Sequence, residues 1–209
     1  GGGGMLVKIC GLGSAEQVQA AVAAGADAVG FVFAESVRRV TPEQAARYAA
    51  DVPPGIKRVA VMLHPTNADW QDVLQGFNPD VLQTDAEDFA DLDVPDSVER
   101  WPVYREGNEV PVTLFHEQRN KVTGTLFLYE GAKSGQGETV DWGAAAALAR
   151  QGNMILAGGL SAANVAEAVM TVKPYGVDVS SAVESAPGQK DARLIEQFIE
   201  AARAAEKRL

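Results

Sequence analysis

The stretch LVKICGLGS, residues 6–14, predicts a short apolar strand, a glycine turn and the start of a helix. The helix is expected from Ala15 onward, where the apolar residues take up helical spacing. Cys10 is the only cysteine of the chain, and it stands at the carboxyl end of this strand. In (β/α) barrels the strand ends and the loops after them carry the chemistry, so Cys10 is a candidate catalytic group. The alternative is a thiol that only packs in the core, as most free cysteines do.

The length and composition are those of a globular α/β protein. The chain has 209 residues, of which 46% are hydrophobic, enough for one α/β barrel or one large open α/β domain. Its formal net charge of −10 argues against a nucleic-acid surface, so no nucleic-acid partner is expected. No apolar run approaches the roughly 20 residues of a membrane span, and the N-terminus lacks a signal-peptide pattern. We therefore expect no membrane partner and a cytoplasmic location, which a single cysteine also suits.

Strand-like and helical segments alternate along the chain. Four glycines, residues 1–4, precede Met5, and we interpret them as a tag or cloning remnant. The predicted strands are 6–10, 28–33, 58–63, 80–83, 101–104, 125–129, 154–157 and 177–179. Beyond the first helix, the predicted helices are 42–51, 67–75, 144–150, 162–172 with Ser161 as its N-cap, and 194–203. Residues 86–123 are the least legible part of the chain.

This alternation predicts a single α/β domain, residues 5–209, folded as a (β/α)8 TIM barrel with a parallel eight-stranded core. Runs such as RVAVML, residues 58–63, are apolar almost throughout, as a strand covered on both faces requires. An open doubly wound sheet is the alternative. It would need a phosphate loop after the first strand, and GLGS, residues 11–14, has too few glycines for the dinucleotide fingerprint.

Two late turns predict an anion site. Gly158 and Gly159 follow the seventh strand, and Ser180, Ser181 and Ala182 follow the eighth. Barrels often hold a phosphate between these two loops, because glycines let backbone N–H groups approach the anion and a helix N-terminus adds partial positive charge. The alternative is that the two glycines only make a tight turn.

Several motifs, in order and at barrel-strand spacing, resemble the phosphoribosylanthranilate isomerase family of tryptophan biosynthesis. They are KICG (8–11), GADAVGFVF (25–33), SVRRVTP (36–42), LAGGL (156–160) with NV (164–165), and VDVSSAVE (177–184) with PGQKD (187–191). The resemblance implies an isomerase that performs an Amadori rearrangement by general acid/base catalysis. It would convert N-(5-phosphoribosyl)anthranilate to 1-(2-carboxyphenylamino)-1-deoxyribulose 5-phosphate. We accordingly expect a small-molecule phosphoribosyl substrate, no metal, no cofactor and a monomer.

The resemblance also implies residue roles. Cys10 matches the family base, and because a free thiol has a pKa near 8.5 we expect the site to lower it or to supply a proton acceptor. Glu130 stands where the family has its acid, an aspartate, and is longer by one methylene. Arg38 matches the arginine that faces the anthranilate carboxylate, although its neighbour Arg39 leaves a shift of one residue open. Asp178 matches an aspartate at the substrate. The alternatives are a solvated loop carboxylate, a surface arginine and a turn aspartate.

Two positions depart from the family pattern. QTDA, residues 83–86, stands where the family commonly reads Gln-Leu-His-Gly, and the Asp85 carboxylate would be unfavourable near a dianionic substrate unless it points away. Ala182 replaces a glycine. If that position needs a positive φ, alanine costs about 1–2 kcal/mol, and its Cβ would crowd the phosphate.

Two other functions are compatible with the sequence. A metal-dependent phosphosugar epimerase would need clustered histidine and carboxylate ligands, and the chain has only His64 and His116. A barrel that binds a phosphorylated metabolite without turnover would share the phosphate site. Only turnover separates that function from an isomerase.

Overall fold

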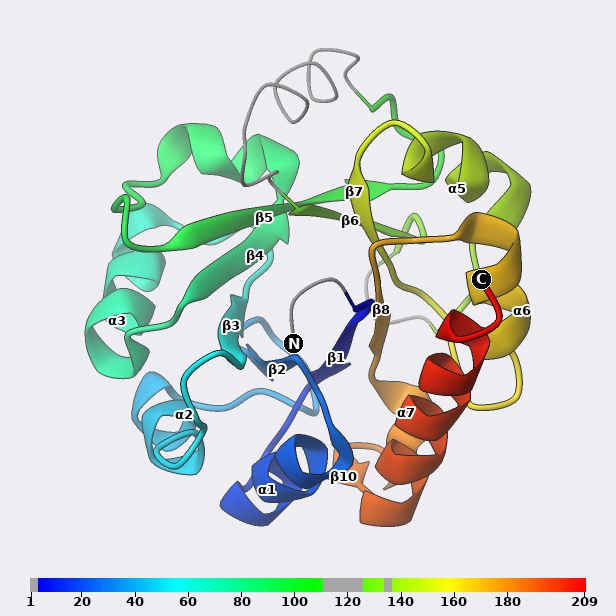
Figure 1. Cartoon of the computed structure of the whole chain (residues 1–209). Coiled ribbons are helices and arrows are strands. Elements are labelled where there is room, and N and C mark those ends of the chain that lie inside the picture. Colours follow the sequence, from blue (N-terminus) through cyan, green and yellow to red (C-terminus); the bar gives the residue numbers. More distant parts are fainter. Residues whose placement is uncertain (1–3, 111–125, 134–136) are drawn as a thin grey trace.

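The computed structural model describes residues 4–110, 126–133 and 137–209. Eight parallel strands close into a barrel in chain order, with β1 beside β8 (Figure 1). They are β1 Leu6–Cys10, β2 Ala28–Val32, β3 Lys57–Val61, β4 Val81–Asp85, β5 Glu99–Arg105, β6 Leu126–Glu130, β7 Asn153–Leu156 and β8 Gly176–Val179. The predicted (β/α)8 barrel is confirmed, and the alternative of an open sheet is wrong.

Helices surround the barrel on its outside (Figure 1). They are α1 Ala15–Ala24, α2 Pro42–Tyr48, α3 Asn67–Phe77, α5 Trp142–Ala149, α6 Val165–Val172 and α7 Ala192–Glu206, with short 3₁₀ turns η1 Ala86–Asp91 after β4 and η2 Ser181–Val183 after β8. A small hairpin, β9 Glu184–Ala186 and β10 Gln189–Lys190, follows η2. Side-chain caps define several starts: Thr41 and Thr66 each form a capping box at α2 and α3.

The helix after β7 begins later than predicted. It starts at Val165, and Ser161 is not its cap. Asn164 takes the N-cap position, but its side chain accepts from the Ser161 N–H at 2.8 Å and donates to the Gly159 carbonyl at 2.9 Å. Because an asparagine side chain can offer the backbone local bonds in place of helical ones, residues 161–164 form a turn.

Two strand boundaries also differ from the prediction in ways that affect the site. β5 runs over Glu99–Arg105 and so contains Arg105, which the predicted strand 101–104 left out. β3 ends at Val61, so His64 lies beyond it, with a positive φ of 47°. Residue 125, the predicted start of the sixth strand, lies outside the described residues.

Strand residues alternate between two apolar layers. One layer packs between strands and helices and includes Val7, Ile9, Phe31 and Phe127. The other fills the barrel interior and consists of Ala28, Val59, Val81, Trp101, Val103, Leu126, Leu128, Ile155 and Ala157. Continued toward the carboxyl ends of the strands, the interior rows become polar. We call this end of the barrel the mouth.

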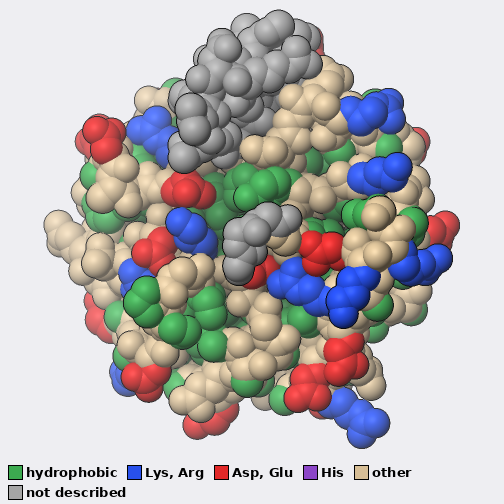
Figure 2. Space-filling view, viewed as in Figure 1, with side chains coloured by type: hydrophobic (Ala, Val, Ile, Leu, Met, Phe, Trp, Pro, Cys, Tyr) green, Lys and Arg blue, Asp and Glu red, His purple; other side chains and the backbone are tan. Residues whose placement is uncertain are grey.

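Charge on the outside is mixed. The face in Figure 2 carries acidic and basic side chains near one another around its rim. None of the described helices is both long and apolar enough to span a bilayer.

Candidate active site

The thiol lies in a crowded corner of the mouth. Cys10 pairs in register with Gly30 of β2. A Cβ on Gly30 would stand 3.2 Å from Cys10 Sγ and 3.1 Å from Lys8 Cε, so the glycine leaves room for both side chains. Lys8 is fully buried, and its Nζ donates to Asp178 Oδ1 at 3.0 Å, an ion pair that the β1–β8 register sets up. Asp178 is therefore not a turn or capping residue but part of the barrel interior.

The charges around Cys10 oppose one another. Burial raises the pKa of the Cys10 thiol because a buried thiolate loses its hydration, while Lys8 and Lys190 lower it and Asp178 raises it. The net direction is upward, so the expected lowering is absent in the free protein. Burial would lower the pKa of Lys8, but Asp178 and Cys10 outweigh it and raise that pKa, so Lys8 stays charged. A fixed ammonium beside a thiol favours the thiolate.

Glu130 ends β6 and pairs in register with Arg105 of β5. Its side chain is 18% exposed, so it is not a solvated loop carboxylate. Burial raises the pKa of Glu130, Arg105 opposes this, Asp178 raises it and Lys8 lowers it. Cys10 and Glu130 therefore both interact with the Lys8–Asp178 pair, and a carboxyl with a raised pKa can hold a proton for donation.

A second ion-pair group lies at the mouth near β8. Arg38 donates through Nε and Nη2 to Glu184, at 2.8 and 2.7 Å, and Nη1 donates to no described residue. Lys190 on β10 donates to the same carboxylate at 2.9 Å and to the Ser180 carbonyl at 2.9 Å. Burial would raise the pKa of Glu184, but these hydrogen bonds lower it. Glu184 thus holds the Arg38 guanidinium in a fixed place and leaves Nη1 without a partner among the described residues. An arginine on an open surface would not be fixed in this way.

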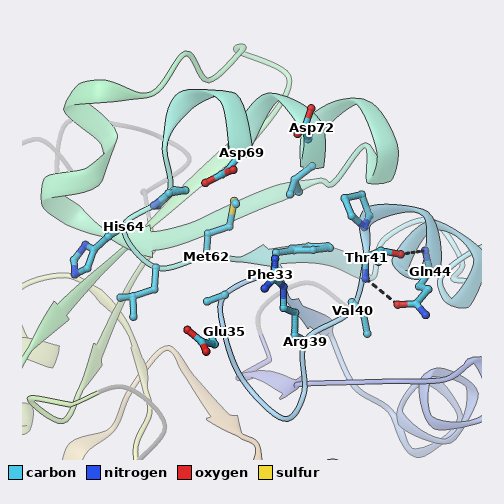
Figure 3. A pocket seen from close by; sticks show the side chains of 15 residues that line it. Phe33, Glu35, Arg39, Val40, Thr41, Gln44, Met62, His64, Asp69 and Asp72 are labelled. Atoms are coloured by element: carbon cyan, nitrogen blue, oxygen red, sulfur yellow. Dashed lines mark hydrogen bonds between the residues drawn. The ribbon is translucent and has the colours of Figure 1, made fainter.

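Arg39 lies elsewhere, in a groove of about 840 Å³ beside the mouth. Figure 3 shows Phe33 and Met62 at the apolar wall of this groove, with Asp69 and Asp72 of α3 on its far side. Arg39 lines the groove and Arg38 does not. Of the two arginines, Arg38 is the one that interacts electrostatically with Cys10.

The two glycines after β7 are required by packing. Gly158 and Gly159 have φ of 97° and 65°. A Cβ on Gly158 would stand 2.8 Å from the Glu138 carbonyl oxygen, and one on Gly159 would stand 2.7 Å from the Thr139 backbone nitrogen. The turn is thus tight, and it lies against the segment that precedes α5.

Backbone donors remain available at this place. The N–H groups of Gly158, Gly159, Ser181 and Ala182 donate to no described residue. Ala182 is not among the described non-glycine residues with positive φ, so the strain considered for an alanine there does not arise.

Asp85 does not stand as an unpaired carboxylate. It accepts from Arg105 Nε at 3.1 Å and from Nη2 at 2.8 Å, and both residues are buried. The unfavourable charge expected at this position is therefore offset by a cation.

His64, Asp85 and Glu87 also form a cluster with metal-ligand atoms, but Arg105 already engages Asp85 and His64 Nδ1 contacts Asp88 at 2.8 Å. His116 lies outside the described residues.

Sequence reasoning left four residues of the mouth without a role: Lys8, Arg105, Glu184 and Lys190. Gln83 of β4 is a fifth, and its Oε1 is buried with no hydrogen-bond partner among the described residues. Lys8, Gln83 and Arg105 share a signal that could have found them. Each occupies an inward position, two or four residues after an interior apolar residue of its strand.

Known proteins resemble this chain over almost its whole length. The family described as N-(5′-phosphoribosyl)anthranilate (PRA) isomerase matches residues 7–201. An N-(5′-phosphoribosyl)anthranilate isomerase of Geobacter sulfurreducens is 42% identical over 200 residues, 94% of this chain and 98% of that protein. A phosphoribosyl anthranilate isomerase solved with reduced 1-(o-carboxyphenylamino)-1-deoxyribulose 5-phosphate has TM-score 0.79 and 29% identity, covering 96% of this chain and 99% of that one.

A third relative is a monomeric form of the dimeric Thermotoga maritima phosphoribosylanthranilate isomerase, with TM-score 0.76 and 28% identity, covering 96% of this chain and 99% of that one. A family match over most of the chain, with relatives of this identity and coverage, leaves one conclusion. The chain belongs to the N-(5′-phosphoribosyl)anthranilate isomerase family.

Proposed function

We propose that Cys10 and Glu130 are the base and the acid with which this N-(5′-phosphoribosyl)anthranilate isomerase converts its substrate. The observation that carries the proposal is their shared surrounding: Cys10 is buried, Glu130 is half-buried, each is the last residue of its strand, and both interact with the Lys8–Asp178 ion pair. Acid/base isomerisation of a small sugar needs two proton-transfer groups around one substrate, each within roughly 3 Å of the atom it serves.

The proton transfers follow from the two environments. Glu130, whose pKa burial raises, gives its proton to the ribose ring oxygen, and the ring opens to a Schiff base. Cys10 then takes the proton from C2′ as a thiolate, which the charged Lys8 stabilises. The resulting enolamine tautomerises to the ketone. The extra methylene of Glu130, compared with an aspartate, is accommodated by seating the carboxyl beside Arg105, at 3.8 Å.

The remaining groups would orient the substrate. Arg38 binds the anthranilate carboxylate through Nη1, because Glu184 already fixes the other two nitrogens. Asp178 uses only Oδ1 for Lys8, so Oδ2 can accept from a sugar hydroxyl. The phosphate is held by backbone N–H groups of Gly158, Gly159, Ser181 and Ala182, with Ser180 beside them. This arrangement lets an acidic protein bind an anion through local dipoles.

Complementation of a tryptophan auxotroph that lacks this step tests the proposal, together with kcat measured on purified variants. We expect Cys10→Ser and Glu130→Gln each to lower kcat by about 100-fold or more, since general acid/base groups contribute about 10²–10⁴-fold. Glu87→Gln is the matched control, an exposed carboxyl of η1 that should leave kcat unchanged. Growth and normal kcat in either active-site variant would overturn the assignment. Wild-type binding without turnover would favour a binding protein.

We also propose that residues 5–209 form one monomeric domain in the cytoplasm and that residues 1–4 are an added tag. Among the described residues the exposed large hydrophobics are Val37, Leu63, Tyr175 and Leu209. They lie in separate segments outside the helices and strands, and single exposed apolar residues are usual on monomers. Light scattering should give the mass of one chain. A mass of two chains would place this protein with relatives such as the dimeric Thermotoga maritima enzyme.

A further inference from the structure

A buried ion pair bridges β4 and β5 at the mouth, next to Glu130. Asp85 receives two hydrogen bonds from Arg105, at 3.1 and 2.8 Å, through Nε and Nη2. The third guanidinium nitrogen, Nη1, faces the other way. It donates to the Gly131 carbonyl at 3.3 Å and lies 3.8 Å from Glu130 Oε2. The planar guanidinium therefore connects the ends of three neighbouring strands, β4, β5 and β6.

We propose that the Asp85–Arg105 pair is a positioning device for the Glu130 carboxyl, in which Arg105 fixes the place of the carboxyl and Asp85 offsets the charge that Arg105 brings. This inference rests on the proposed function, because it requires Glu130 to be the acid. The longer glutamate side chain has more rotamers than an aspartate, and a contact from the neighbouring strand restricts them.

The charge balance explains why both members are needed. Arg105, Lys8, Asp178 and Asp85 face Glu130, from β5, β1, β8 and β4. Arg105 alone would favour the ionised carboxylate, which cannot donate a proton. Asp85 acts in the opposite sense, so Glu130 keeps an Arg contact without losing the proton that the reaction needs.

Stability alone accounts poorly for such a pair. Desolvation of two buried charges often cancels their attraction, so apolar residues in their place are frequently as stable. The chain also carries a comparable arginine–aspartate ion pair at the opposite end of the barrel, where the strands begin. There Arg58 at the start of β3 contacts Asp80, just before β4, at 3.3 Å. It is far more exposed and lies away from the mouth, so it serves as the control.

The experiment measures the titration of Glu130 itself and kcat in the full-length enzyme. The Glu130 signal is found in ¹³C NMR of protein labelled at glutamate carboxyls, by its loss in Glu130→Gln. The variants are Asp85→Asn, Arg105→Gln and the double variant. The double variant leaves no unpaired buried charge, so it keeps the test usable if a single variant fails to fold. Arg58→Gln is the control.

We expect Asp85→Asn to lower the titration midpoint of Glu130 by about one pH unit, because the positive charge of Arg105 is then no longer offset. Arg105→Gln should raise the midpoint by about as much, because the negative charge of Asp85 is then left without its partner. The double variant should return near the wild-type midpoint. Both variants that lack Arg105 should lower kcat by about 100-fold, as a misplaced catalytic group does, with KM changed less. Arg58→Gln should change neither quantity.

Three outcomes overturn the inference: a Glu130 midpoint that is the same in all variants, a double variant with normal kcat, or Arg58→Gln acting like Arg105→Gln. Failure of the proposed function looks different. In that case Glu130→Gln itself keeps normal kcat, whatever the titration of Glu130 shows in the other variants.

Discussion

Replacing Lys8 by methionine tests the source of the Cys10 thiolate. Methionine keeps most of the length of the side chain and removes its charge. Cys10 Sγ and Lys8 Nζ lie 3.2 and 3.3 Å from the same point, the place that a Cβ on Gly30 would occupy. The ammonium is therefore close enough to act directly on the sulfur. Its removal also leaves the Asp178 carboxylate, which disfavours the thiolate, without its partner.

The magnitude follows from these two effects. An opposite charge at this range shifts a pKa by about 1–3 units, so the pKa of Cys10 should rise by at least about one unit in Lys8→Met. The thiolate fraction at neutral pH, and with it kcat, should fall about tenfold or more. The stability cost is separate. Removing one partner of a buried pair costs about 3–5 kcal/mol, whereas Lys8→Met with Asp178→Asn removes both charges and should cost less.

The single cysteine makes the assay direct. Thiolate absorbance is followed against pH, and the same titration of Cys10→Ser is subtracted to remove the tyrosine contribution. Urea unfolding gives the free energy of each variant, and circular dichroism confirms that the titrated samples are folded. A Cys10 midpoint in folded Lys8→Met that equals or lies below that of the wild type would refute the role of Lys8.

Three further perturbations follow from the same contacts. In Gly30→Ala the new Cβ would lie 3.2 Å from the sulfur of Cys10, so kcat should drop about tenfold for a stability loss of about 1–3 kcal/mol, measured by steady-state kinetics and thermal melts. Glu184 has a lowered pKa, so its contribution is present above the ordinary value of 4.5 and is lost as pH falls through the folded value. The stability gap between wild type and Glu184→Gln in urea should therefore be largest near neutral pH and shrink in acid. Ala182→Gly should cost about 0.4–1 kcal/mol in urea unfolding, since the backbone there has no positive φ that a glycine would relieve.

The sequence predicts the barrel well because strands covered on both faces appear in it as short, almost continuous apolar runs. TLFLY, residues 125–129, is apolar almost throughout, as such a strand requires, and the number of such runs favours a barrel over an open sheet. The ends of individual helices and strands are harder to predict. Asn164 replaces Ser161 as the N-cap because its side chain forms hydrogen bonds with the preceding turn. The end of β5 is hard to predict because its last residue is a charged arginine. Neither effect is visible in the spacing of apolar residues.

The candidate site divides in the same way. Cys10 and Glu130 could be found because each directly follows an apolar run. The pairing of their charged neighbours could not be predicted, because the two ion pairs concerned join residues far apart in sequence. Lys8 meets Asp178 across 170 positions, and Arg105 meets Asp85 across 20. Only barrel closure and strand register bring such residues together.

The balance of charge at the mouth links substrate binding to proton supply. Among the described residues, the ion pairs around Cys10, Arg38 and Glu130 set four cations, Lys8, Arg38, Arg105 and Lys190, against four carboxylates, Asp85, Asp178, Glu130 and Glu184. Protonation of Glu130 removes one negative charge from these pairs, which favours an anionic substrate. By linkage, the bound anion must then raise the pKa of Glu130. The substrate would thus help to keep the proton on the acid that its own ring oxygen requires.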